Sequence, residues 1–404
     1  MRRPFFTARN REDAPQHTIR NIFAGDFVRA FLAYFTFLIA CFALIPTLPV
    51  FFARSGSSET EIGVLVGVCS ISSLVFRLMV GRILLKYSEK KVIIHSALLF
   101  GATFLACIAL RSFWSFFVVR IFQGIALAGT DTAVLAFILN ITPLAYRVRT
   151  IGYFMLAPPF ATVIAPALGM FLVNQYSFTV FFLSCAGMSL CAFFSSCTLR
   201  SPAVEKLDQG TAPHNTSFFQ WKILVPALNG FLHNFIWGSV GAFFPLYAIQ
   251  CGVANPGFFF SAIAVMMIAG RVLGGRIFDA WGNEKIIPAF IFVSMIAMVI
   301  LSFSRTLPMF VVAGLLWGLS CAFFFPACMT YALDYANSSG GPAVGTFRAL
   351  QDLGLALGPT IMGIIIRFTG YQAMFSCLAL VCLINLGYFQ FYVRKKAHVA
   401  SNIL

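Results

Sequence analysis

Long apolar segments recur along the chain from Asp26 to Val393, separated by short polar stretches. Each segment is long enough for the ~20 residues that a helix needs to cross ~30 Å of hydrocarbon. The pattern predicts an all-α membrane protein with twelve transmembrane helices joined by loops of roughly ten residues. The predicted spans are 27–53, 61–81, 92–110, 113–138, 151–173, 177–199, 223–248, 257–275, 285–304, 308–333, 344–366 and 371–393.

The composition leads to the same fold class. Apolar residues make up 60% of the chain, charged residues only 10%, and 48 residues are Phe. A water-soluble fold of this size could not bury that much apolar surface. We therefore expect the lipid bilayer to surround the chain, with little protein outside it.

The N-terminal segment and the cysteines add two further expectations. Residues 1–25 are basic and polar, without the apolar run of a signal peptide, which predicts a retained cytoplasmic tail. Most of the eleven cysteines fall within apolar spans, and no CxxC or His-paired spacing occurs. We expect packing cysteines, with no disulfide, metal or cofactor.

The basic residues, which give the chain a net charge of +15, are spaced by apolar spans and form no patch for nucleic acid. With an even number of spans, nineteen Lys and Arg residues fall on one side of the bilayer. The other side has four, namely Arg54, Arg111, Arg305 and Arg367. This positive-inside asymmetry places both termini in the cytoplasm and predicts a multi-pass protein of the bacterial cytoplasmic (inner) membrane.

The sequence repeats itself with an offset of 194 residues, which superposes Arg77-x3-Gly81-Arg82 on Arg271-x3-Gly275-Arg276 and Gly124 on Gly318. An offset of 193 continues the match, with Pro166 on Pro359. Coinciding Arg, Gly and Pro in one order are hard to obtain by chance, so two similar six-helix halves are predicted. The predicted units are a tail at 1–25, bundles at 26–199 and 223–393, a polar linker at 200–222 and a tail at 394–404.

A charged turn is predicted after the second and the eighth spans. After the eighth it has Gly275, Arg276, Asp279 and Gly282, where the acid can pair with Arg276 or accept from a helix N-terminus. Such a pair can hold one gate conformation; an ordinary solvated turn is the alternative. The first copy begins with Gly81 and Arg82 but has Leu85 in place of the acid and Ser88 in place of the second Gly.

The fourth span contains Arg120, Gln123, Gly124 and Asp131. Arg120 and Asp131 are eleven residues apart, which is about three turns plus 20°, so they share a helix face that should point at the pathway. Asp131 is the leading candidate for a protonatable carboxylate. The alternatives are that Arg120 braces a helix, and that Asp131 is a structural partner of Arg147 or Arg149.

The fifth span has a row of small residues around a proline, at Gly152, Ala161, Ala165, Pro166 and Gly169. Small residues at this spacing allow a neighbouring helix to approach closely, and the proline bends the helix. The eleventh span repeats the pattern. Close packing alone is as good an explanation as a directional role.

Several further polar residues are candidates for solute contact. The seventh span contributes His233, Asn234 and Trp237, although a lone membrane His more often bonds to a neighbouring helix. Tyr34 lies in the first span. In the eleventh span, Arg348 and Asp352 are four residues apart, which favours an ion pair over solute binding.

These motifs resemble those of the major facilitator superfamily, in particular its twelve-helix drug and metabolite exporters. Arg120-x2-Gln123-Gly124 is similar to the family's R-x-x-Q-G signature, Gly275–Lys285 to its loop signature, and Gly152-x8-Ala161-x3-Ala165-Pro166-x2-Gly169 to its antiporter signature with two Gly replaced.

The resemblance implies alternating access between two halves, proton coupling linked to Arg120, Gln123 and Asp131, and export of a small organic solute by a monomer. Proton-coupled uptake of a metabolite is the alternative. An enzyme is disfavoured because no H-E-x-x-H, G-x-S-x-G or Cys/His cluster occurs, and the scattered charges form no channel filter.

Overall fold

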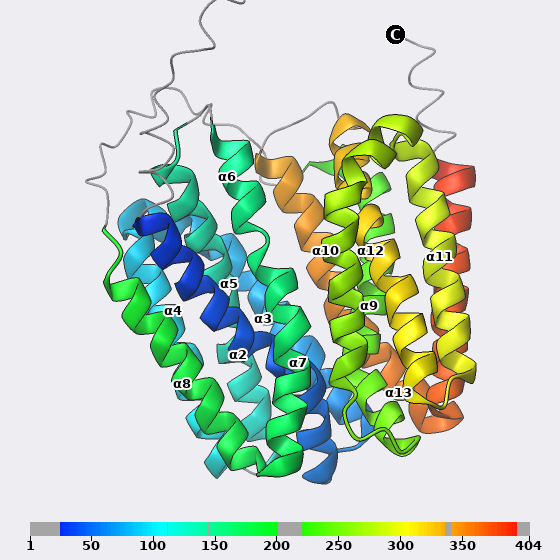
Figure 1. Ribbon diagram of the computed structural model, residues 1–404, viewed down its shortest axis with the longest axis horizontal. Helices are drawn as coiled ribbons and strands as arrows, with labels where there is room; N and C mark the ends of the chain where they lie inside the picture. The colour runs from blue at the N-terminus through cyan, green and yellow to red at the C-terminus, as the bar shows by residue number, and fades with distance from the viewer. Residues whose placement is uncertain (1–24, 111, 144–145, 201–219, 336–340, 394–404) are drawn as a thin grey trace, which may run out of the picture.

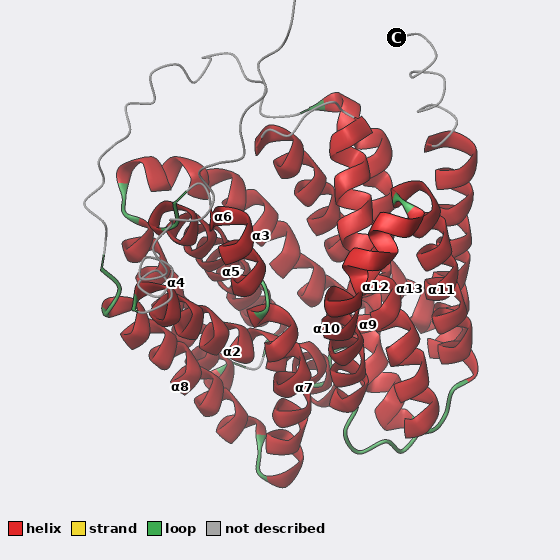
Figure 2. Ribbon diagram, turned by 45° about the horizontal axis from the view of Figure 1, so that its top comes forward, coloured by secondary structure: helices red, strands yellow, loops and turns green. Residues whose placement is uncertain are grey.

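The computed structural model describes residues 25–110, 112–143, 146–200, 220–335 and 341–393, and within these ranges the chain is helical without strands (Figure 2). Most of the predicted tails and linker lie outside the described residues. The elements are α2 (Asp26–Arg54), α3 (Glu59–Lys86), α4 (Glu89–Ala109), α5 (Phe113–Ile141), α6 (Arg147–Phe154), α7 (Ala157–Gln175), α8 (Phe178–Cys197), η2 (Trp221–Ile223), α9 (Leu224–Gln250), α10 (Gly257–Trp281), α11 (Asn283–Phe303), α12 (Leu307–Tyr335), α13 (Gly341–Gly387) and η3 (Tyr388–Val393).

The described residues confirm the predicted fold class. They include 10 helical segments long and apolar enough to cross a membrane, with a shorter apolar helix at Gly257–Val272. The longest segment, Ala343–Val393, has 51 residues and changes direction at Gly370, whose φ of 83° is not helical. Gly370 lies between the predicted spans 344–366 and 371–393.

The fifth span differs from its prediction. It was expected to run unbroken over 151–173, but the helix stops after α6 and restarts as α7. The cause is the pair Pro158 and Pro159, which have no N–H to donate to the carbonyl groups four residues earlier. Hydropathy is insensitive to this loss because both prolines lie in an apolar stretch.

The charged turns are also shorter than predicted. Gly81 and Arg82 lie inside α3, which continues to Lys86, and the helical backbone of α10 runs on to Trp281. Gly282 alone separates α10 from α11, and its φ of 70° is the left-handed conformation that favours glycine. The side chains of Gly275, Arg276 and Asp279 lie outside the described residues, so the predicted gate pair stays a prediction.

The helices form two groups, α2–α8 on one side of the molecule and α9–α13 on the other (Figure 1). The predicted repeat is visible in their packing. A Cβ added at Gly124 of α5 would lie 2.2 Å from the Cys69 carbonyl oxygen of α3, and one added at Gly318 of α12 would lie 2.4 Å from that of Ile263 in α10. Cys69 and Ile263 are themselves 194 residues apart, so both halves make the same helix contact.

The two groups of helices are in backbone contact at the end of the molecule opposite the α3–α4 and α10–α11 turns. There α3 packs against α13, where a Cβ at Gly63 would lie 2.2 Å from the Pro359 carbonyl oxygen. On the other flank, Gly257 at the start of α10 touches the backbone of Pro166 and Ala167 in α7. Glycines at these points let the backbones of the two halves touch.

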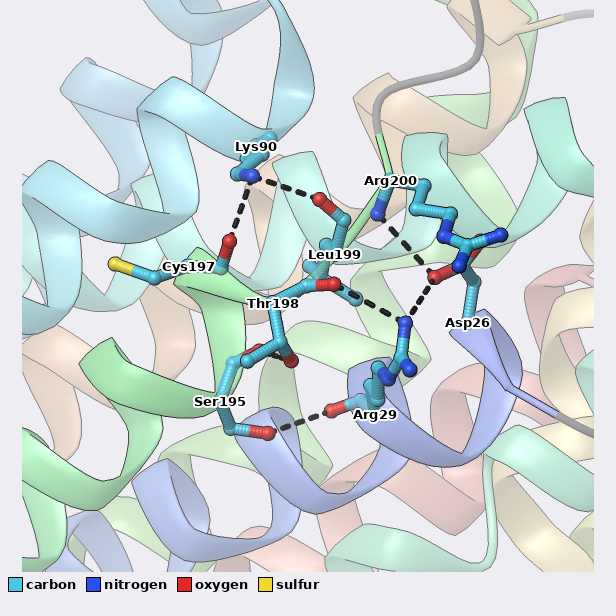
Figure 3. Close-up of polar contacts among 8 residues, drawn as sticks. All are labelled: Asp26, Arg29, Lys90, Ser195, Cys197, Thr198, Leu199 and Arg200. Atoms are coloured by element: carbon cyan, nitrogen blue, oxygen red, sulfur yellow. Dashed lines mark hydrogen bonds and ion pairs between the residues drawn. The ribbon is translucent and has the colours of Figure 1, made fainter.

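The C-terminal end of α8 is held by basic side chains from other helices (Figure 3). Lys90 of α4 donates to the carbonyl oxygens of Cys197 and Leu199, both at 2.7 Å, and Arg29 of α2 donates to that of Thr198 at 3.2 Å. The last carbonyl groups of a helix have no partner within it and carry partial negative charge, which a cation neutralises. The start of the linker is thereby fixed to the first group of helices.

Gly318→Ala tests the close helix contact. The added methyl group has no room against the α10 backbone, so we expect a lower midpoint of thermal denaturation in detergent. Gly187→Ala in α8 is the matched control, because a Cβ there meets nothing within 4 Å. Its midpoint should stay the same or rise, and equal losses in both variants would contradict the packing account.

Lys90→Met should lower the free energy of unfolding by about 1–3 kcal/mol, because it leaves two helix-terminal carbonyl groups without their charged donor. The readout is again the thermal midpoint in detergent. Lys91→Met serves as the control, since the exposed neighbouring side chain makes no such contact in the described residues. If both substitutions had the same effect, loss of positive charge rather than of the α8 contact would be the cause.

Candidate functional site

A group of four polar side chains joins the two halves near the middle of the helices. Arg77 of α3 lies between two carboxylates, with NH2 3.7 Å from Asp131 Oδ2 in α5 and Nε 3.5 Å from Asp352 Oδ2 in α13. Tyr34 of α2 donates to Asp131 Oδ1 at 3.0 Å. We call Tyr34, Arg77, Asp131 and Asp352 the central ion group; Asp352 is its member from the second half.

The three charged residues of the central ion group lie at a similar distance from the ends of their helices. Arg77 is nine residues from the end of α3, Asp131 ten from the end of α5 and Asp352 eleven from the start of α13. At 1.5 Å per residue, each lies about 15 Å inside its helix, which is near the middle of a bilayer. Ionisable residues at that depth need partners within the protein, and here they supply one another.

The pairing differs from two predictions. Asp131 was expected to pair with Arg147 or Arg149 if its role were structural, but those side chains bond to the Thr142 carbonyl and the Tyr153 hydroxyl. These predicted partners are wrong.

The predicted pair of Arg348 with Asp352 is also wrong. Arg348 donates to Gln351 at 3.5 Å, while Asp352 pairs with Arg77.

A cavity of about 960 Å³ lies between the halves beside the central ion group. The first half contributes α6 and the turn after it, and the second half contributes α9, α10, α12 and α13. Of the predicted solute contacts, Asn234, Trp237 and Arg348 line it. The lining also contains Arg149, Gly152, Tyr153, Met155, Leu156, Met267, Ile268, Arg271, Val272, Cys321, Phe325, Pro326, Met329, Phe347, Gln351 and Leu355.

His233 is buried beside the cavity, and it is absent from the described lining. Its ring stacks on Phe324 at 4.3 Å and its Nε2 is 3.5 Å from Cys321 Sγ. It therefore belongs to the packing between α9 and α12, the alternative given for a lone membrane histidine. Tyr34 is also absent from the lining, and its ring stacks on Phe154 while its hydroxyl serves the central ion group.

Arg120 and Gln123 lie nearer the start of α5 than Asp131. Arg120 Nε donates to the Leu65 carbonyl of α3 at 2.8 Å, and its NH1 donates to Gln123 Oε1 at 2.7 Å. Both side chains are buried. Eleven residues of helix put Arg120 about 16 Å from Asp131, so the contacts of Arg120 join α5 to α3 within one half.

The small residues of the fifth span face both α2 and α10. Gly169 packs against Ala43 and Thr47 of α2, and Ser261 of α10 donates to the Val163 carbonyl at 2.5 Å. The repeat in α13 packs in the same manner, since Cβ atoms at Gly354 and Gly358 would strike the α9 backbone. Close packing is thus present in both halves.

Gly152 does not join this packed face. A Cβ added there meets nothing within 4 Å, and the residue lines the cavity.

Arg77 and Arg271 are the residues of the candidate site that the motif analysis did not single out. Arg271 of α10 reaches across to the first half, where its guanidinium donates to the Met155 carbonyl oxygen. In an unbroken helix the Met155 carbonyl would accept from the N–H of residue 159, but that residue is a proline and has no N–H. The available signal was the repeat itself, which aligns Arg77 with Arg271 inside apolar spans.

Comparison with known proteins identifies related chains. The family model described as Major Facilitator Superfamily matches residues 30–339 and 227–403. The staphylopine export protein of Staphylococcus aureus is 22% identical over 380 residues, which cover 91% of this chain and 96% of that protein. Multidrug resistance protein 1 of Bacillus subtilis is 27% identical over 337 residues, 80% of this chain and 85% of that protein.

Solved structures share the fold. A variant of the nucleoside transporter NupG gives a TM-score of 0.75 at 13% identity, over 90% of this chain and 98% of that chain. A bacterial homologue of the human lysosomal transporter Spinster, in an inward-facing and unoccupied conformation, gives 0.74 at 14% identity, over 90% and 95%.

A double-mutant cycle on Arg77→Gln and Asp352→Asn tests the central ion group. Arg77→Gln leaves two carboxylates without their cation, whereas Asp352→Asn leaves Arg77 paired with Asp131. Because the Arg77 and Asp352 side chains attract each other, the double variant should be more stable than the sum of the single effects by about 0.5–3 kcal/mol. Thermal denaturation in detergent measures it. A parallel cycle with Asp334→Asn, an exposed acid near the end of α12, should be additive. Additivity in both cycles would show that Arg77 and Asp352 do not interact.

Proposed function

Because the chain belongs to the Major Facilitator Superfamily, we propose that it is a proton-coupled exporter of a small organic solute that works by alternating access. The observation that supports the coupling is the central ion group, which joins the halves beside their shared cavity. The protein is a multi-pass bacterial membrane transporter. We assign it to the cytoplasmic membrane, with twelve spans when α10 and both arms of α13 are counted.

The direction of export is supported by two of the relatives. One is named an export protein and the other a multidrug resistance protein, and each aligns with most of the chain. In this orientation the positive-inside asymmetry puts the α3–α4 and α10–α11 turns in the cytoplasm. The cavity then takes its solute from the cytoplasm, while the close contacts of α3 with α13 and of α7 with α10 shut the opposite side.

Charge balance suggests how a proton acts. Arg77, Asp131 and Asp352 together carry a net charge of −1 when all are ionised, and one proton removes it. Protonation of Asp131 also ends its attraction to Arg77, which then pairs with Asp352 alone. The structure, with both ion pairs formed, corresponds to the state after proton release to the cytoplasm.

We expect Asp131→Asn to reduce pH-gradient-driven export to the level of empty liposomes, because the amide cannot carry a proton. Solute binding should survive, since the amide has nearly the size of the carboxylate and can accept from Tyr34. The experiment uses purified protein in liposomes, imposed pH gradients of either sign and a panel of solutes. Asp334→Asn is the control and should transport like the parent protein.

Three outcomes separate the alternatives. Gradient-driven transport that persists in Asp131→Asn would remove Asp131 from the coupling. Uptake in the direction of proton flow would replace export by symport. Solute movement that ignores the gradient in the parent protein would refute proton coupling altogether.

A further inference from the structure

The cavity between the halves is lined by three arginines, one from each of three helices. They are Arg149 of α6, Arg271 of α10 and Arg348 of α13, and none of the described lining residues is Asp or Glu. Each guanidinium contacts another lining residue: Arg149 lies over the Tyr153 ring, Arg271 bonds to the Met155 carbonyl and Arg348 bonds to Gln351. The charges therefore lie at the cavity wall.

Within the described residues, no carboxylate is at ion-pair distance from Arg149, Arg271 or Arg348. The nearest acids are in the central ion group, where Asp131 and Asp352 already share Arg77. Adding that group's net −1 to the three arginines leaves a surplus of +2. All three arginines are exposed in the structure, so their surplus charge is open to whatever enters the cavity.

The internal repeat explains why Arg271 has no carboxylate partner among the described residues. Arg77, its counterpart 194 residues earlier, is flanked by Asp131 and Asp352. The same offsets place Phe325 and Pro159 where Arg271 would need those two acids. The second half thus keeps the arginine, which is exposed at the cavity wall, and the described residues give it no acidic partner. In the first half the arginine pairs with Asp131, whereas in the second half Arg271 can pair with an acidic group of a bound solute.

We infer that the transported solute is an organic anion with at least two negative charges, which the three arginines bind. The inference rests on the proposed function. Guanidinium groups bind carboxylate or phosphate in a bidentate manner, and the apolar wall of Trp237, Phe325 and Leu355 suits a carbon skeleton. An anion on Arg271 competes with the Met155 carbonyl, so binding loosens a contact between the halves.

The sign of the cavity can be measured without knowing the solute. Met329→Cys places a reporter thiol in the cavity lining. Cys321, which also lines the cavity, and the cysteines that are not buried are first replaced by Ser, namely Cys41, Cys191, Cys197, Cys251 and Cys377, so that only buried native thiols remain. The reaction rates of the reporter thiol with an anionic and a cationic methanethiosulfonate reagent are normalised to those of a free thiol. We expect the anionic reagent to react at least about tenfold faster, because a cleft of one charge sign concentrates the opposite ion.

Arg271→Gln and Arg348→Gln should each lower this preference, and Arg305→Gln on the opposite side of the membrane should leave it unchanged. Two cavity variants keep the test valid if one fails to fold. Equal rates, or a faster cationic reagent, would overturn the anion inference. So would a preference that neither cavity variant reduces.

A transport experiment separates this inference from the proposed function. Everted membrane vesicles are offered carboxyfluorescein, a polyanion, and ethidium, a cation. Accumulation of carboxyfluorescein alone, abolished by Arg271→Gln, supports the inference, whereas accumulation of ethidium alone overturns it and leaves export standing. If neither dye moves, the reagent rates still decide the sign of the cavity, and proton-driven export is judged separately by the liposome experiment.

Discussion

A guanidinium placed in the middle of a bilayer must find its counter-charge within the protein, because the surrounding hydrocarbon offers none. Arg77 finds two, Asp131 in its own half and Asp352 in the other. This constraint fixes where α3, α5 and α13 meet, and it places a charged contact between the halves, which the proposed alternating access would have to separate. The distances of 3.5 and 3.7 Å describe ion pairs without close hydrogen bonds. Such pairs are easier to part than a bidentate contact.

The two halves show how a repeated scaffold can carry unequal chemistry. Gly124 and Gly318 make the same close contact in each half, so the backbone packing is shared. The charged residues, in contrast, have different partners in the two halves. Arg77 is neutralised by acids, whereas Arg271 bonds to a carbonyl group that Pro159 leaves without a donor. The first half supplies Arg77 and Asp131 to the central ion group, and the second half supplies two of the three arginines that line the cavity.

Most of the fold could be predicted from the sequence, because the length and apolar character of each segment suffice to place a membrane helix. The repeat was visible in coinciding Arg, Gly and Pro. The break between α6 and α7 was missed because apolar content does not register the missing N–H groups of Pro158 and Pro159. The partner of Asp131 was also missed, since it depends on which helix faces meet in space. The face shared by Arg120 and Asp131 was inferred from helix geometry, but nothing in the spacing showed that Arg120 would bond to α3.

The most direct test of the central claim, that the Arg77 ion pairs hold the halves in one of two arrangements, is a distance measurement between spin labels. One pair is placed at Tyr87 and Ala280, on the side of the α3–α4 turn, and a second pair at Ser55 and Thr369 on the other side. Arg77→Gln should shorten the first distance and lengthen the second, and Asp352→Asn should do the same, because each removes the ion pair that joins the halves. Distances that respond to neither change would contradict the account.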